Sequence, residues 1–246
     1  APLRAPVSFY CYDDVVARGF EPFALTRPTS ELRAGAALVR ERWALALQEA
    51  AAGFVGAPHL AGFAEFDAPP AVRDGVLPAG SVVANARAVV PLDARAGDGF
   101  VWTVGGRVAA VRLRAPLAAS ALADGTLDLA ALVAPEAART ELGGWWLDAV
   151  WDLIGQLQQH LLADLAVLGP QVATVPHGAA VLGPHPVWIE DGATVEPHVV
   201  FDTTAGPVLV RRGAQVHAFT RVAGPCYVGF DALVASDRVS GCAIGD

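Results

Sequence analysis

The chain has 246 residues, of which 54% are hydrophobic, and its 25 acidic and 17 basic residues give a net charge of −8 at pH 7. This composition supports a sizeable core and excludes a disordered chain. The acidic balance argues against a general binder of nucleic acid or of anionic membranes.

Every basic residue is an arginine. A cation that holds a phosphate in this protein is therefore a planar guanidinium, which suits bidentate contacts. The three cysteines are too few and too widely spaced for a disulfide framework or a zinc site, which favours a reducing compartment. No apolar segment of signal-peptide length precedes the first acidic residues, and prolines interrupt the charge-free stretch 165–189. We therefore expect a cytoplasmic protein without a membrane-spanning segment.

Three segments of the first 170 residues have the character of strands. Residues 7–12 (VSFYCY) predict a buried strand, and residues 81–85 (SVVAN) predict another. Residues 100–113 predict a hairpin that turns at Gly105 and Gly106. The first part of the chain is therefore expected to contain a sheet.

Two further segments have the pattern of helices. Thr29 and Ser30 are capping candidates for a helix that ends near Gly53. A second helix face leads to Gly169 and consists of Leu147, Val150, Ile154, Leu157, Leu161, Leu165 and Leu168. Strands that alternate with helices predict an α/β domain over residues 1–170.

A period of six residues characterises the rest of the chain. Aliphatic residues recur at this interval, and small or aliphatic residues follow them by four positions. The clearest series are Val210, Val216, Val222, Val228 and Val234, with Ala214, Thr220, Cys226 and Ala232. Earlier members are Val175 with Val181, and Ile189 with Val195 and Phe201. Neither a helix nor a flat strand keeps every sixth residue on one face.

A six-residue repeat is typical of a parallel β-helix, whose three-sided coil places one aliphatic residue of each side inside. Residues 171–246 would supply about four coils of roughly eighteen residues each. Segments rich in glycine and proline near 182–188 and 202–209 interrupt the period and predict corners or short loops. The repeat runs on to the last residues without a polar cap, so we expect a fragment or the loss of further coils.

Two adjacent carboxylates, Asp13 and Asp14, follow the first predicted strand. Open α/β sheets bind ligands beyond the carboxyl ends of their strands. Arg18, Arg27 and Arg33 come soon after in the chain. Carboxylates that could hold Mg²⁺, beside arginines that could neutralise phosphates, predict a nucleotide or sugar-phosphate site. The alternative is that acidic turn residues and a solvated helix face account for all five.

Polar residues later in the chain could reach the same crevice. Asn85 and Arg87 end the strand predicted at 81–85, although Asn85 is also compatible with a plain turn. Asp152 begins a predicted helix and is a candidate metal ligand. Its alternative role is a cap of that helix.

Histidines of the repeat region suggest a second class of chemistry. In trimeric hexapeptide β-helices, histidines of neighbouring subunits can form a zinc site or supply the general base of an acyl transfer. The four candidates are His177, His185, His198 and His217. No two of them have the close spacing of metal ligands, and the alternative is that each is a surface residue.

Three segments, FALTRPTSELRAGAALVRERW (23–43), ANARAVVP (84–91) and WDLI (151–154), followed by hexapeptide coils, resemble the GlmU-like sugar nucleotidyltransferases. These are bacterial bifunctional enzymes that make UDP-N-acetylglucosamine. The resemblance spans nearly the whole chain and is most specific from Thr26 to Trp43. It implies a Rossmann-like nucleotidyltransferase domain followed by a left-handed parallel β-helix that forms a homotrimer.

The resemblance also implies a reaction. A nucleoside triphosphate and a sugar 1-phosphate would combine into a nucleotide sugar, with diphosphate leaving and Mg²⁺ as cofactor. Acetyl-CoA would be a substrate only with later coils, which this chain does not contain.

Carried over position by position, the resemblance is uneven. The usual glycine-rich loop, G-x-G-T-R, is replaced by DDVVARG, in which Arg18 takes the place of its arginine. Arg27 and Pro28 replace a proline-lysine pair that contacts phosphate, and Asn85 stands where an aspartate normally holds Mg²⁺. The candidate residues are Arg18 and Arg27 for catalysis, Asp13, Asp14, Arg33, Asn85 and Arg87 for substrate binding, and Asp152 for the metal.

Three functions fit this pattern. The first is a sugar-1-phosphate nucleotidyltransferase similar to UDP-N-acetylglucosamine diphosphorylase. The second is a hexapeptide-repeat acyltransferase whose degenerate first domain binds a sugar nucleotide or acts as a scaffold. The third is an assembly module, in which the β-helix builds a trimer and the first domain docks a partner. The residues do not choose the base, the sugar or the metal.

Overall fold

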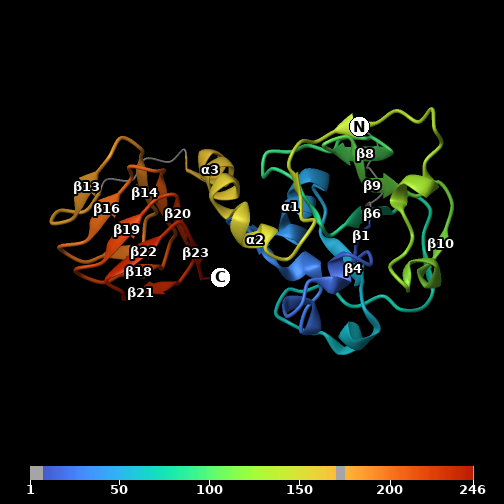
Figure 1. The fold of residues 1–246 in the computed structure, drawn as a ribbon, viewed down its shortest axis with the longest axis horizontal. Coiled ribbons are helices and arrows are strands. Elements are labelled where there is room, and N and C mark those ends of the chain that lie inside the picture. Colours follow the sequence, from blue (N-terminus) through green and yellow to red (C-terminus); the bar gives the residue numbers. More distant parts are fainter. Residues whose placement is uncertain (1–7, 170–174, 246) are drawn as a thin grey trace. The chain divides into compact units, whose positions relative to one another are not determined.

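The computed structural model describes residues 8–169 and 175–245. They form two compact units, of which the first ends at Asp152 and the second begins at Leu153. The first unit is an α/β domain and the second is a parallel β-helix (Figure 1). The predicted fold class is therefore confirmed.

A mixed six-stranded sheet forms the centre of the first unit. Its strand order is β11-β8-β9-β6-β1-β4 (Figure 1). Neighbouring strands are parallel except around β9, which runs antiparallel to both β6 and β8. The strands are β1 (Phe9–Tyr12), β4 (Ala51–Val55), β6 (Val82–Asn85), β8 (Val101–Val104), β9 (Arg107–Arg112) and β11 (Thr140–Glu141). The strand predicted at 81–85 and the hairpin at 100–113 are confirmed, as is the described part of the strand at 7–12.

Short elements surround this sheet. Three two-stranded pairs are β2 (Arg33–Ala34) with β3 (Ala37–Leu38), β5 (Val76–Leu77) with β10 (Leu117–Ala118), and β7 (Ala88–Val89) with β12 (Trp145–Trp146). The 3-10 helices are η1 (Ala17–Gly19), η2 (Phe23–Leu25), η3 (Thr29–Glu31), η4 (Pro58–Gly62), η5 (Ala119–Leu122) and η6 (Leu129–Leu132). The α-helix of this part is α1 (Val39–Leu47), whose Trp43 is fully buried and donates a hydrogen bond to the carbonyl of Ala88.

The helix predicted from Thr29 to near Gly53 is wrong over most of its length, because a hairpin occupies its first part. Strands β2 and β3 pair around a turn in which Gly35 has a φ of 70°. A left-handed residue does not fit an α-helix, so α1 begins only at Val39. Its cap is also different, since Glu41 Oε2 accepts a hydrogen bond from Leu38 N at 2.8 Å.

The same helix ends earlier than predicted. Gln48 follows α1 with a φ of 59°, and Ala51–Val55 form β4 beside β1. The alanines of this segment favour a helix locally, but parallel pairing with β1 outweighs that propensity. Gly53 permits a close approach, because a Cβ at this position would overlap Cγ2 of Val72.

The second predicted helix also starts later than its apolar pattern suggests. The chain first forms β12, and the helical residues divide into α2 (Asp152–Gly155) and α3 (Leu157–Leu168). Leu147 is buried all the same, because it follows β12 and donates its N–H to the carbonyl of Arg87.

Three parallel sheets wind around the core of the second unit. Each strand pairs in parallel with the strand three places later in the chain, as a three-sided coil requires. One side contains β13 (Ala180–Leu182), β16 (Val200–Asp202), β19 (Arg221–Ala223) and β22 (Arg238–Ser240). The second contains β14 (Val187–Ile189), β17 (Val208–Val210), β20 (Cys226–Val228) and β23 (Ala243–Ile244). The third contains β15 (Thr194–Val195), β18 (Gln215–Val216) and β21 (Leu233–Val234).

The six-residue pattern of the sequence is confirmed as the inside of this coil. Val210 pairs with Val228, and Val216 pairs with Val234, in each case eighteen residues later, which equals three hexads. Most of the aliphatic positions and of the small residues that follow them belong to one hydrophobic cluster. The exceptions are Val181, which is 42% exposed, and Thr220, which is buried but polar. The predicted interruptions fall at the corners between β13 and β14 and between β16 and β17, which are longer than the corresponding corners between β19 and β20 and between β22 and β23.

Helix α3 covers the outer face of the second side of the coil. Leu209 and Tyr227 alternate with the inward residues of β17 and β20 and so point outward, yet both are buried. Leu162 of α3 lies beside Gly206, and Gly169 lies against the ring of Trp188. Because α3 packs on the coil, the compact units divide before it. The domain boundary expected near residue 170 stays a prediction.

Within residues 8–169 and 175–245, no helix combines the length and the apolar character needed to cross a membrane. Cys11, Cys226 and Cys242 form no disulfide.

Two phenylalanines offer a test of the coil's inside and outside. Phe201 is fully buried in the coil core, whereas Phe219 is 77% exposed. We expect Phe201→Ala to lower the free energy of unfolding by about 4 kcal/mol, because it removes buried apolar surface and leaves a cavity. The matched Phe219→Ala variant should cost less than about 1 kcal/mol. Denaturant unfolding followed by circular dichroism measures both, and equal losses would contradict the assigned register.

Candidate functional site

A cavity of about 410 Å³ opens at the carboxyl ends of β1 and β6 in the six-stranded sheet. Residues that follow β1 and β6 line it, together with the turn of the β8–β9 hairpin. The chain passes from β1 to β4 on one side of β1 and then reaches β6 on the other side. Such a reversal is a topological switch point, the usual position for ligands in open α/β sheets.

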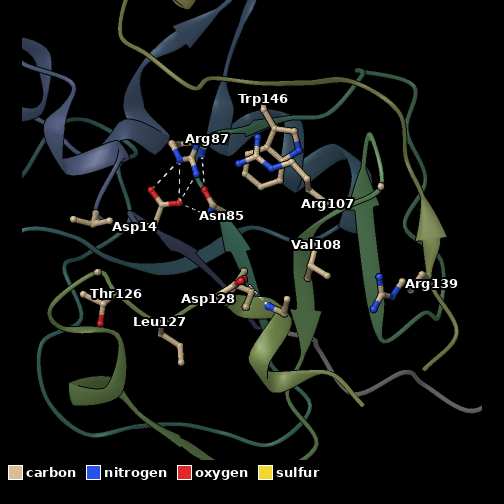
Figure 2. A pocket seen from close by; sticks show the side chains of 15 residues that line it. Asp14, Asn85, Arg87, Arg107, Val108, Thr126, Leu127, Asp128, Arg139 and Trp146 are labelled. Atoms are coloured by element: carbon tan, nitrogen blue, oxygen red, sulfur yellow. Dashed lines mark hydrogen bonds and ion pairs between the residues drawn. The ribbon is translucent and has the colours of Figure 1, made fainter. Parts of the chain in front are cut away.

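A cluster of three polar side chains forms one wall of the cavity (Figure 2). Arg87 donates to Asp14 through Nε, at 2.9 Å from both carboxylate oxygens, and through Nη2, at 2.7 Å from Oδ2. Asn85 Nδ2 donates to the same Oδ2 at 2.9 Å, and Asn85 Oδ1 accepts from the backbone N–H of Arg87. The structure therefore brings together Asp14, Asn85 and Arg87, three of the predicted substrate-binding residues.

This ion pair is largely shielded from water. The side chains of Arg87 and Asp14 are only 7% and 13% exposed. Burial alone would raise the pKa of Asp14, but the hydrogen bonds from Arg87, Ala17 and Asn85 outweigh it, so the pKa lies below its ordinary value. Asp14 is therefore a carboxylate committed to Arg87 at neutral pH.

A second arginine approaches the cavity from the start of β9. Arg107 stacks over the ring of Trp146, with its guanidinium carbon 4.0 Å from the ring centroid. Its Nη1 donates to Asp148 Oδ1 at 2.9 Å, and Nη1 of Arg87 donates to the same oxygen at 3.0 Å. Mainly the hydrogen bond from Arg107 holds the pKa of Asp148 below its ordinary range.

Glu141 fixes the hairpin that carries Arg107. Its carboxylate accepts hydrogen bonds from the backbone N–H groups of Gly105 and Gly106, at 2.8 and 3.1 Å, and from the hydroxyl of Thr103. Arg139, two residues before Glu141, lines the cavity away from the Asp14 cluster (Figure 2). Among the described residues Arg139 has no hydrogen-bond or ion-pair partner. Its guanidinium is thus available for an anionic ligand.

Arg18 shapes the cavity without lining it. Its Nε donates to the carbonyl of Asp13 at 3.0 Å, Nη1 to that of Ala123 at 2.7 Å and Nη2 to that of Leu122 at 3.1 Å. These bonds hold the loop before the cavity wall at 125–130. A Cβ at Gly125, where φ is 79°, would come 2.8 Å from Nε of Arg18, so the loop needs glycine there.

Asp13 is buried and does not line the cavity. It is 3% exposed, its Oδ2 accepts from Thr29 N at 3.2 Å, and its Oδ1 has no hydrogen-bond partner among the described residues. Burial raises the pKa of Asp13 to about 7. This side chain connects β1 to the segment at 26–35 rather than facing the cavity.

The remaining predicted residues lie outside the cavity lining. Arg27 forms an ion pair with Glu65 at 2.9 Å, with both side chains well exposed. Arg33 donates through Nη1 to the carbonyl of Ala36 at 2.7 Å. Asp152 Oδ2 accepts the N–H groups of Asp148 and Ala149, at 2.8 and 2.9 Å, so it holds the turn that precedes α2. The catalytic and metal roles of these residues stay predictions.

The sequence reasoning missed the charged and aromatic cavity residues Arg107, Asp128, Arg139 and Trp146. Arg107 had a usable signal, because it follows the predicted hairpin turn and an antiparallel strand begins where its parallel neighbours end. Trp146 had none, since only the pairing of β12 with β7 brings it beside Arg87.

Comparison with known proteins identifies one family. A protein-family model described as sugar nucleotidyl transferase matches residues 9–171. No curated protein matches the chain.

Because the ion pair of Asp14 with Arg87 is buried, substitution of Arg87 should lower stability more than substitution of an exposed arginine. We expect Arg87→Ala to lower the free energy of unfolding by about 3 kcal/mol or more, because it leaves the Asp14 carboxylate buried without its partner. The exposed pair of Arg27 with Glu65 serves as the control, and Arg27→Ala should cost less than about 1 kcal/mol. Similar losses in urea unfolding of the two variants would contradict this assignment.

Asp13 predicts a pH dependence of stability. Since its pKa rises from an ordinary 3.8 to about 7 on folding, the folded state holds the proton more tightly than the unfolded state. Stability should therefore fall as pH rises from about 4 to about 7, by on the order of 4 kcal/mol at most. Asp13→Asn keeps the acceptor for Thr29 N and removes the charge, so it should remove this fall. The free energy of unfolding is measured at pH 5 and pH 8, with Asp93→Asn, at an exposed position, as the control. If Asp13→Asn keeps the pH dependence of the wild type, the assignment is refuted.

Proposed function

The chain belongs to the sugar nucleotidyl transferase family through residues 9–171, and on that premise we propose that it forms a nucleotide sugar from a nucleoside triphosphate and a sugar 1-phosphate. One observation carries the proposal: an arginine-lined cavity lies at the switch point of the sheet, where such folds bind phosphates.

The proposed reaction is an in-line displacement. A phosphate oxygen of the sugar 1-phosphate forms a bond to the α-phosphorus of the nucleotide. The bond between that phosphorus and the oxygen that bridges to the β-phosphate breaks, and diphosphate leaves with the electron pair. The protein's part is to hold both substrates and to stabilise the negative charge of the transition state.

The arginines of the cavity suit this part differently. Arg87 is committed to Asp14, so it shapes the wall and orients Asn85. Arg107 is half exposed and held over Trp146, which leaves donors of its guanidinium to face a ligand. Arg139 has the freest guanidinium of the three. Arg107 and Arg139 therefore bind the phosphates in this proposal.

Mg²⁺ remains part of the proposal. In phosphoryl-transfer sites this ion is usually held by one or two carboxylates together with substrate phosphates. Asp128 fits that role, because it lines the cavity, is exposed, and uses only Oδ1 in a hydrogen bond, from Ala130 N. Asp14 is already engaged by Arg87 on both oxygens. When bound, the ion would neutralise phosphate charge.

Within this class we favour an activity like that of UDP-N-acetylglucosamine diphosphorylases. The resemblance of residues 26–43 to these enzymes and the hexapeptide coil support this choice. A homotrimer through the β-helix belongs to the same proposal. Because α3 already covers the side of the coil that contains β17 and β20, a second copy would pack on one of the other two sides. The acyltransferase alternative would require acetyl-CoA as a substrate. Histidines of the repeat suggested a zinc site for it, but among the described residues no group of histidine, cysteine or acidic side chains could hold a metal ion.

The proposed activity is tested by diphosphate release. Purified protein with Mg²⁺ is supplied with each pairing of common nucleoside triphosphates and sugar 1-phosphates, and at least one pairing should release diphosphate. Arg139→Gln should then lower kcat/KM about 100-fold, because it removes a phosphate ligand. The exposed Arg114→Gln lies outside the cavity and should leave the rate unchanged. No release with any pairing would reject the function, and full activity of Arg139→Gln would reject the assigned site.

A further inference from the structure

The net charge in and around the cavity is close to zero, although three arginines line it. Three arginines, Arg87, Arg107 and Arg139, line it, and two carboxylates, Asp14 and Asp128, line it with them. Asp148 adds a third negative charge by its ion pairs with Arg87 and Arg107. A polyphosphate carries several negative charges, so a neutral site would bind it weakly in the absence of a metal ion.

Asp148 is the carboxylate that two of these arginines share. A single oxygen, Oδ1, accepts hydrogen bonds from Nη1 of Arg87 and Nη1 of Arg107. Two guanidinium groups that converge on one oxygen form the arrangement with which proteins grip a phosphate oxygen. The side chain of Asp148 is 65% exposed and lies just outside the cavity lining.

We propose that Asp148 acts as an internal stand-in for a phosphate, and that a bound polyphosphate displaces it from Arg87 and Arg107. The class of ligand, a nucleoside triphosphate or its diphosphate product, rests on the proposed function. The displacement itself rests on the geometry of Asp148.

Asp14 and Asp148 differ in exposure, and this difference decides which of the two a ligand can displace. Asp14 is 13% exposed and accepts hydrogen bonds from Arg87, Asn85 and Ala17, so its removal would strand a buried arginine. Asp148 is exposed, and a bound phosphate would take its place as the partner of the buried Arg87 and the half-exposed Arg107. The backbone around Asp148 need not move, because Asp152 holds its N–H independently of the side chain.

The displacement changes the charge that the ligand meets. With Asp148 turned into solvent, the cavity arginines outnumber the nearby carboxylates, and Arg107 gains free donors in addition to those of Arg139. Without a ligand, Arg87 and Arg107 stay paired with Asp148, and the ligand replaces this carboxylate with a more highly charged phosphate. Asp148 thereby lowers the affinity for polyphosphate and favours release of the diphosphate product.

Inorganic diphosphate is the probe for this competition. Isothermal titration without metal ion at low ionic strength compares wild type with Asp148→Asn, which keeps the shape of the side chain and loses its charge. We expect Asp148→Asn to bind diphosphate about tenfold more tightly. Asp93→Asn changes the net charge equally at an exposed position outside the cavity and should bind as wild type does. Melting curves of the variants check that each is folded.

A double variant locates the effect. Arg107→Gln in the Asp148→Asn background should return the affinity to the wild-type value or below it. The proposal is overturned if Asp148→Asn binds diphosphate no more tightly than wild type, if Asp93→Asn shows the same gain, or if the gain survives Arg107→Gln. Diphosphate binding needs no turnover. If Asp148→Asn binds diphosphate more tightly but no substrate pairing releases diphosphate, the proposed reaction is rejected. The proposed role of Asp148 as a stand-in for a phosphate is then kept.

Discussion

The buried ion pair between Asp14 and Arg87 is the interaction on which the cavity depends. Asp14 follows β1, and Arg87 lies between β6 and β7, so the pair ties together the two strands at the switch point. The same guanidinium donates to the carbonyl of Leu147 and so reaches the segment after β12. Arg87 donates to Asp14, Leu147 and Asp148, so the pair organises the cavity wall. In the proposed displacement, a phosphate replaces only the contact of Arg87 with the exposed Asp148.

The absence of lysine gives this arrangement its character. A guanidinium offers several donors in one plane, so one arginine can hold several chain segments at once. Arg18 holds three carbonyl groups of two segments, and Arg87 joins three parts of the chain. Arginine is therefore a structural connector at some positions and, in the proposed function, a phosphate ligand at others. Neighbouring acceptors, and not residue type, separate the two roles.

The two units differ in how far their structure follows from local pattern. In the coil, the inward valines from Val210 to Val234 repeat every six residues, and Val210 pairs with Val228 eighteen positions later, so a count along the chain identifies both as core. In the first unit, the strand at 51–55 has alanines that favour a helix, and only pairing with β1 makes it a strand. The helix expected from Thr29 onward fails at its start because β2 pairs with β3, and at its end because β4 pairs with β1.

From composition, period and strand ends alone follow the α/β class of the first unit, the β-helix of the second, and the place of Asp14, Asn85 and Arg87 at one edge of a sheet. These features depend on residue spacing, which is local. Whether an arginine faces the cavity depends on which carbonyls and carboxylates surround it after folding. Only the tertiary structure therefore separates Arg107 and Arg139, which face the cavity, from Arg18 and Arg27, whose guanidinium groups contact other parts of the chain.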